Sequence, residues 1–173
     1  MLKALRRAAA RRRTASDLAI TIVRRGLSPT FYRDFGVPDT FNGRFDVVSL
    51  HAFLVLSVLD GEPDRALSQD LVNALFQSFE DALRDQGAGD MGMTRRIQKI
   101  AGAFYGRLEA YRAATTREEV AAVLLRNLYG ENRRFQTQAL ALAAYMERAR
   151  LGLEPAALAE GVVTFGPLPD EED

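Results

Sequence analysis

The thirteen residues between Asp46 and Asp60 form the most apolar stretch of the chain, and they constrain the fold more than any other feature. Three polar residues interrupt the run: Ser49, His51 and Ser57. A helix built from this stretch is apolar on nearly every side, so other helices must cover it in water. The stretch predicts an all-α bundle of about six to seven helices around a buried central helix, over about residues 44–59.

Capping and helix-breaking residues divide the rest of the chain into further helices. Because Ser, Thr and Asn cap helix N-termini, we expect Ser16 to precede a helix that ends at Gly26, and Thr40 or Asn42 to cap the central helix. The other expected helices are a turn over 31–35, one from Ser68 to Gly87, one capped by Thr94, one opened by a capping box at 116–119, one over about 132–151 and one from Pro155 to Glu160. We find no strand alternation and no internal repeat.

The length of 173 residues fits one domain. We expect a basic, flexible arm over 1–15, a helical domain over 16–165 and an acidic tail over 166–173. The formal charge is zero overall, but residues 1–25 carry eight basic residues and one acidic residue, whereas residues 154–173 carry six acidic residues and no basic one. The basic head indicates an anionic partner, such as ribosomal RNA or anionic lipid. A solvated, partly disordered arm explains it equally well.

The head is also similar to a mitochondrial presequence, because it is rich in Arg and Ala and free of acidic residues. Since little of the chain is left over beyond the domain, we favour a bacterial cytoplasmic protein, peripheral at the inner face of the membrane. The mitochondrial matrix side is the alternative. No run reaches eighteen apolar residues, so we expect no transmembrane helix.

Residues typical of catalysis are scarce. The absence of cysteine excludes disulfides, thiolate metal sites and a cysteine nucleophile. His51 is the only histidine, and its place in an apolar run predicts a core residue with one hydrogen-bond partner. Residues 87–92 match G-x-G-x-x-G, but a helix and not a strand precedes them, so we expect no dinucleotide site. We therefore predict a non-enzyme without metal or cofactor; a small helical enzyme is the weakest alternative.

The expected helix after Thr94 has two unusual features. Gly102 and Gly106 lie one turn apart inside it, and each costs about 1 kcal/mol relative to alanine. We interpret them as positions where a neighbouring helix or a partner approaches closely. The outer side also carries basic residues, which fit either a solvated face or a docking patch: Arg95, Arg96, Lys99, Arg107 and Arg112. The seven-residue link before this helix is too long for a helix-turn-helix, so we expect no DNA binding.

Three blocks of sequence, together spanning about residues 16–145, resemble the assembly chaperones of ubiquinol–cytochrome c reductase, respiratory complex III. The first block is residues 31–46, FYRDFGVPDTFNGRFD, with the apolar helix that follows. The second is LSQDL at 67–71, with Phe76 and Asp81. The third is GAGD at 87–90, with Arg95, Arg96, Lys99 and AFYGR at 103–107.

This resemblance implies an all-helical chaperone that binds newly made cytochrome b and helps it mature into the complex. It also implies work near the ribosomal tunnel exit and the membrane, and possible cooperation with a small partner protein. The resemblance transfers no catalytic residues. The candidate partner-binding residues that match the family's blocks are Tyr32, Asp39, Arg44, Asp46, His51, Arg95, Lys99, Phe104, Tyr105 and Arg107.

Several candidates have a purely structural alternative. Arg44 and Asp46 could form an ion pair with each other, and Phe104 falls on the expected inner face of its helix. Tyr105 falls off that face, so it is the better candidate for contact. We expect the central helix and the Gly102–Gly106 helix to line an apolar groove for a nascent membrane helix. The rival hypothesis is a membrane- or ribosome-associated adaptor that acts through the Arg-rich head alone.

Overall fold

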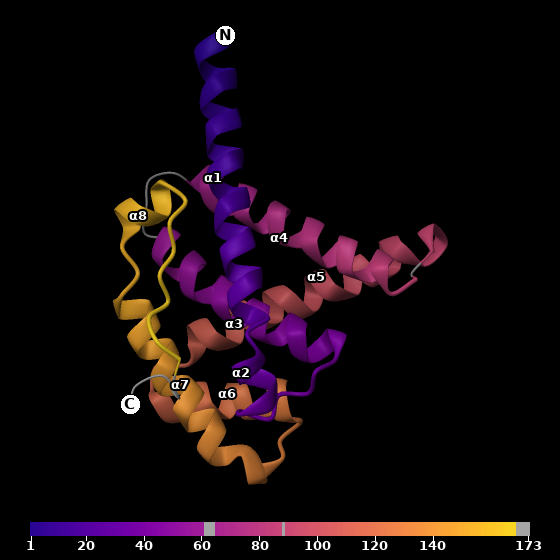
Figure 1. Ribbon diagram of the computed structural model, residues 1–173, viewed down its shortest axis with the longest axis vertical. Coiled ribbons are helices and arrows are strands. Elements are labelled where there is room, and N and C mark those ends of the chain that lie inside the picture. The colour runs from indigo at the N-terminus through magenta and orange to yellow at the C-terminus, as the bar shows by residue number, and fades with distance from the viewer. Residues whose placement is uncertain (61–64, 88, 169–173) are drawn as a thin grey trace.

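A computed structural model describes residues 1–60, 65–87 and 89–168, and all regular structure in these ranges is helical (Figure 1). The elements are α1 (Leu2–Gly26), α2 (Pro29–Arg33), α3 (Phe41–Leu59), α4 (Arg65–Asp85), α5 (Asp90–Ala113), α6 (Arg117–Tyr129), the 3₁₀ turn η1 (Arg133–Phe135), α7 (Gln136–Leu151) and α8 (Pro155–Ala159). Six helices are long and two have five residues. The all-α prediction is confirmed.

The central helix predicted from the apolar run is α3, and helices α1, α4, α5, α6, α7 and α8 all pack against it. Leu50, Ala52 and Val55 in its middle are fully buried. By length and composition α3 could cross a membrane, but 78% of its most apolar window is buried inside the bundle. It is therefore placed as a core helix, as the apolar run predicts.

The start of α3 is fixed by its cap and by one glycine. The Thr40 hydroxyl accepts a hydrogen bond from the Gly43 backbone N–H at 3.2 Å, so Thr40 is the cap and Asn42 is not. A Cβ on Gly43 would lie 1.9 Å from the Pro38 carbonyl oxygen. The loop before α3 therefore folds back onto its first turn.

Three predicted helix starts are wrong. α1 begins at Leu2, so Ser16 lies inside the helix and not at its cap. α4 begins at Arg65 and not at Ser68, and α5 begins at Asp90 with Gly89 as cap, which leaves Thr94 inside it. In each case strong helix formers or acceptable N-terminal residues precede the polar residue, and the helix extends through it. The turn expected at 60–63 falls mostly outside the described residues.

Most helix boundaries of the C-terminal half are as predicted. The Thr116 hydroxyl and the Glu119 carboxylate form a reciprocal capping box at the start of α6, and Gly130 ends the helix in the left-handed conformation, with φ +55°. The helix expected over 132–151 is divided, because Asn132 caps the short turn η1 before α7 begins. Pro155 opens α8.

Two parts extend from the body of the bundle (Figure 1). The N-terminal half of α1 projects from one end, and α4 and α5 run out together on one side.

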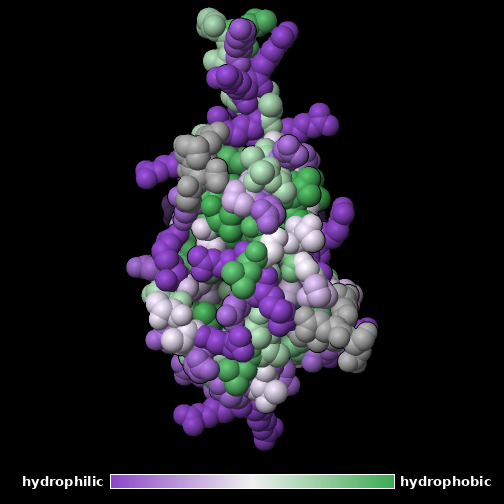
Figure 2. Space-filling view, turned by 90° about the vertical axis from the view of Figure 1, so that its left-hand side faces the viewer, coloured by the Kyte–Doolittle hydropathy of each residue, from purple (hydrophilic) through white to green (hydrophobic). Residues whose placement is uncertain are grey.

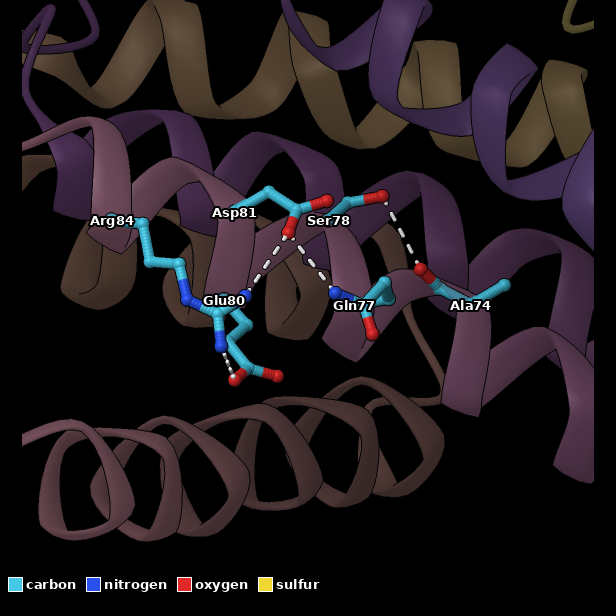
Figure 3. A network of polar contacts seen from close by, with 6 residues as sticks. All are labelled: Ala74, Gln77, Ser78, Glu80, Asp81 and Arg84. Atoms are coloured by element: carbon cyan, nitrogen blue, oxygen red, sulfur yellow. Dashed lines mark hydrogen bonds and ion pairs between the residues drawn. The ribbon is translucent and has the colours of Figure 1, made fainter. Parts of the chain in front are cut away.

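The exposed polar residues near the C-terminal end of α4 bond to one another: Gln77 donates to Asp81 at 3.0 Å, and Arg84 pairs with Glu80 at 2.7 Å (Figure 3). Asp81, which carries part of the family resemblance, is therefore a partner within its own helix.

Candidate functional site

Tyr32, Asp39 and Arg44 lie together on the surface. They border a depression of about 610 Å³ between α2 and the start of α3. Arg44 and Asp39 form an ion pair at 2.6 Å, and this hydrogen bond lowers the pKa of the Asp39 carboxyl. The Tyr32 hydroxyl donates to the Gly26 carbonyl, and burial raises its pKa to about 12. These side chains form a charged surface depression that a partner could contact.

Asp46 is buried near the start of α3, and its partner is Arg107 of α5, not Arg44. The expected Arg44–Asp46 pair is therefore wrong. Residues two apart on a helix point in different directions, and Arg44 faces solvent toward Asp39. Burial raises the pKa of Asp46 to about 6, and the Arg107 guanidinium opposes this rise. The guanidinium carbon of Arg107 also lies 5.0 Å from the centre of the Phe45 ring. Through its contacts with Asp46 and Phe45, Arg107 holds α5 against α3.

His51 is fully buried and has two hydrogen-bond partners, not the one predicted. Its Nδ1 lies 2.7 Å from the Val47 carbonyl oxygen, and its Nε2 lies 2.9 Å from the Tyr145 hydroxyl. Because a carbonyl can only accept, Nδ1 carries the proton and Nε2 accepts from Tyr145. Desolvation lowers the pKa of His51 to about 3, which keeps the ring neutral. The residue joins α3 to α7.

Tyr145, Arg25 and Phe165 complete this buried cluster, and no local signal in the sequence identified them. Arg25 donates to the Tyr145 hydroxyl at 3.1 Å and to the Gly166 carbonyl at 2.6 Å. The Phe165 ring meets the His51 ring edge-on, with centroids 4.9 Å apart. The cluster therefore holds the C-terminal segment against α1, α3 and α7.

The remaining candidates lie on α5 and divide between its inner and outer faces. Phe104 is fully buried, and its ring packs against Phe76 and Phe79 of α4. Tyr105 is 52% exposed and continues this aromatic cluster to the surface, with its ring stacked near Phe76. Arg95 and Lys99 are exposed on the outer face.

Gly102 and Gly106 lie on the same outer face of α5. A Cβ at either position would have nothing within 4 Å. Of the two explanations predicted for these glycines, close approach by a neighbouring helix of this chain is therefore wrong. Approach by a separate partner stays a prediction.

The central helix also contributes to the surface near its C-terminal end, where Ser57 and Val58 are half-buried. There a cavity of about 750 Å³ lies between α4 and α5, with Leu56 of α3 in its wall and Tyr105 and Leu108 at its α5 side. The ion pair between Arg112 and Asp60, at 2.8 Å, borders it. The expected groove between α3 and α5 stays a prediction, because α4 and α5 supply most of the walls of this cavity.

Metal ligands do not gather in the described part of the chain: no three His, Asp or Glu side chains there could hold a metal ion. Asp46 and His51, two groups whose pKa is strongly shifted, are bound to other helices of the bundle. The fold and these positions define an all-α protein built on a buried apolar helix, with charged and aromatic side chains presented on separate outer faces.

Comparison with known proteins identifies the family. Residues 33–164 match the family described as ubiquinol-cytochrome C chaperone, and the chain belongs to this family. It is similar to the crystal structure of the Cbp3 homolog from Brucella abortus, with a TM-score of 0.84 and 32% sequence identity over 99% of this chain and 100% of that one. The family predicted from the sequence is thus confirmed.

A further relative is the Drosophila melanogaster ubiquinol-cytochrome c reductase complex assembly factor 1. It is 35% identical over 89 residues, which are 47% of this chain and 34% of the Drosophila protein. The match therefore spans about a third of that relative's length.

Proposed function

We propose that this protein is an assembly chaperone that binds newly made cytochrome b and holds it for incorporation into ubiquinol–cytochrome c reductase, without a catalytic step. Membership of the chaperone family supports this role, and so does the similarity of the whole chain to the Brucella protein. In this proposal the protein works at the cytoplasmic side of the membrane, or at the matrix side in a mitochondrion. The ribosome near its tunnel exit and a small partner protein are further proposed contacts.

The observation that carries the proposal is the open outer face of α5. A Cβ at two of its glycines, Gly102 and Gly106, would have no described atom within 4 Å. Small residues one turn apart allow the backbone of another helix to approach closely, as they do between membrane helices. A client helix could therefore lie against α5.

The surroundings of this face suit an apolar client. The exposed ring of Tyr105 and the cavity beside it offer an aromatic contact and a recess for a side chain, in the manner of a helix that docks in a groove. Arg95 and Lys99, near one end, would orient a client whose flanking segment is acidic. The depression at Tyr32, Asp39 and Arg44 offers a separate contact for a small partner.

The test is site-specific photo-crosslinking in respiring cells. A photoreactive phenylalanine analogue replaces Tyr105, or, as a control, Val162, which is similarly exposed at 55% on the C-terminal segment. After pull-down and mass spectrometry we expect cytochrome b among the strongest crosslinks from position 105 and not from position 162. Equal yields from both positions, or none from position 105, would contradict this docking surface.

The adaptor role is the second candidate, because residues 2–10 of α1 form a cationic helix that projects into solvent. Deleting residues 2–10 separates the two functions. A chaperone keeps the crosslink from position 105 to cytochrome b and loses only its cellular location. An adaptor loses every partner.

A further inference from the structure

The outer side of α1 carries an unusual share of the exposed apolar surface. The large apolar side chains that are exposed in the described residues number eight, and five of them belong to α1 and its two flanking residues. These five are Met1, Leu2, Leu5, Ile20 and Leu27. We call them, together with the intervening exposed Ala9, the α1 stripe.

The stripe follows one side of the helix. Ile20 comes eighteen residues after Leu2, which is five whole turns at 3.6 residues per turn, so both side chains leave the helix in the same direction. Leu5 and Ala9 follow Leu2 at helical spacing. Ile20 and Leu27 border one shallow depression, whose walls also include Val23 and Pro29. The stripe thus runs from the projecting tip onto the body of the bundle.

Arginines flank the stripe along its length. By helical spacing Arg6, Arg13 and Arg24 follow one edge and Arg12 the other. None of these four has an ion pair within the described chain, whereas Arg11, on the inner side, pairs with Asp70 of α4 at 2.7 Å. The projecting end in Figure 2 accordingly shows mostly hydrophilic side chains around a few hydrophobic ones.

The helix forms without tertiary support over its first turns. Residues 2–13 are Leu, Lys, Ala and Arg only, all strong helix formers, and nearly all of them are exposed. No acidic residue occurs before Asp17 to offset their mutual repulsion. The positive charges of this exposed helix are therefore not neutralised by nearby acidic residues. This uncompensated charge favours contact with an anionic surface.

We propose that the α1 stripe lies in the headgroup region of an anionic lipid bilayer, with α1 parallel to the surface and the body of the bundle held against it through Ile20 and Leu27. An apolar stripe edged by arginines is the pattern of an interfacial helix. Phosphates of RNA would use the arginines but not the exposed leucines and isoleucine, so the stripe favours lipid. The inference rests on the proposed work at a membrane, and it names the surface that makes the contact.

The test uses the absence of tryptophan from the chain. Ile20→Trp places a single fluorescent reporter in the stripe of the full-length protein, and Leu151→Trp places one at an exposed apolar position outside it, 80% exposed. With vesicles of phosphatidylcholine and phosphatidylglycerol we expect a blue shift and quenching by brominated lipid at position 20, and neither at position 151. Pure phosphatidylcholine vesicles should give a much weaker response.

Charge variants give an independent measurement of the same contact. Arg6→Gln with Arg13→Gln should weaken vesicle binding about fivefold for each arginine. The matched pair Arg133→Gln with Arg134→Gln, exposed on η1, should leave it unchanged. An unshifted Trp at position 20 with anionic vesicles, or RNA fragments that bind while vesicles do not, would overturn the proposal. Vesicle binding needs no client protein. If the protein fails to bind vesicles, the crosslinking test of cytochrome b binding is therefore not affected.

Discussion

At the scale of single residues, two buried polar side chains of α3, Asp46 and His51, join this helix to its neighbours. His51, the only histidine in the chain, is neutral and bonded on both ring nitrogens, and Asp46 is bonded to Arg107. A buried polar group is costly unless it is paired, so these residues fix how helices cross. Both side chains are enclosed in the bundle. Their role in partner binding stays a prediction.

The buried histidine makes the stability of the protein depend on pH. The pKa of His51 is about 3 in the folded state and near 6.5 when unfolded, so the unfolded chain takes up a proton first as the pH falls. Compared with His51→Gln, the wild-type protein should lose about 2 kcal/mol of unfolding free energy between pH 7 and pH 5. Urea unfolding of both proteins at each pH measures this. Parallel pH profiles would show that His51 is not enclosed as described.

At the scale of elements, α5 is the helix whose sequence the bundle alone does not explain. Its inner face packs through Phe104, Leu108 and Tyr111, whereas its outer face contains two glycines with nothing near them. A glycine inside a helix is normally replaced at a gain in stability. Its presence here fits a surface that is used by something outside the chain.

Replacing the two glycines should therefore separate stability from binding. Gly102→Ala with Gly106→Ala should raise the unfolding free energy by about 1 kcal/mol per site, because no atom obstructs the new methyl groups. The same double variant should reduce the cytochrome b crosslink from position 105. Gly92→Ala, also open and within α5, is the control that should leave the crosslink intact. A stabilised variant with an undiminished crosslink would remove the glycine face from the binding surface.

At the scale of the whole molecule, the C-terminal segment closes the bundle. Residues 163–168 carry no regular structure, yet Phe165 and Leu168 are buried, and Arg25 of α1 binds the Gly166 carbonyl. A segment more than a hundred residues away from α1 in the chain thus covers the His51 cluster. The acidic residues expected in the tail beyond it fall outside the described residues.

Phe165→Ala tests how much the C-terminal segment stabilises the bundle and shields His51. We expect a loss of about 3 kcal/mol in unfolding free energy, since a buried aromatic ring is removed. Water reaching the cavity should also raise the pKa of His51 toward its ordinary value, which an NMR titration of the ring can follow. Val162→Ala, at an exposed position, is the control and should change neither quantity appreciably. An unchanged His51 titration in Phe165→Ala would show that other groups shield the ring.

The local signals in the sequence were sufficient to predict the fold class and many of the helix boundaries. The apolar run, the capping box at Thr116 and the glycines at 130 and 152 act through neighbours within a few residues, so they can be read without the tertiary structure. The predicted starts at Ser16, Ser68 and Thr94 were wrong because a capping residue can also lie inside a helix, when the residues before it favour one.

The sequence by itself determined an all-α bundle around one buried helix, and the resemblance of its blocks determined the family. Only the tertiary structure decided the pairings: Asp46 with Arg107, 61 residues apart, His51 with Tyr145, 94 apart, and Arg25 with Gly166, 141 apart. Periodicity specifies which face of a helix is buried, but the crossing of helices decides which side chains meet across it. For the same reason, only the assembled bundle shows that the glycines of α5 and the stripe of α1 face outward.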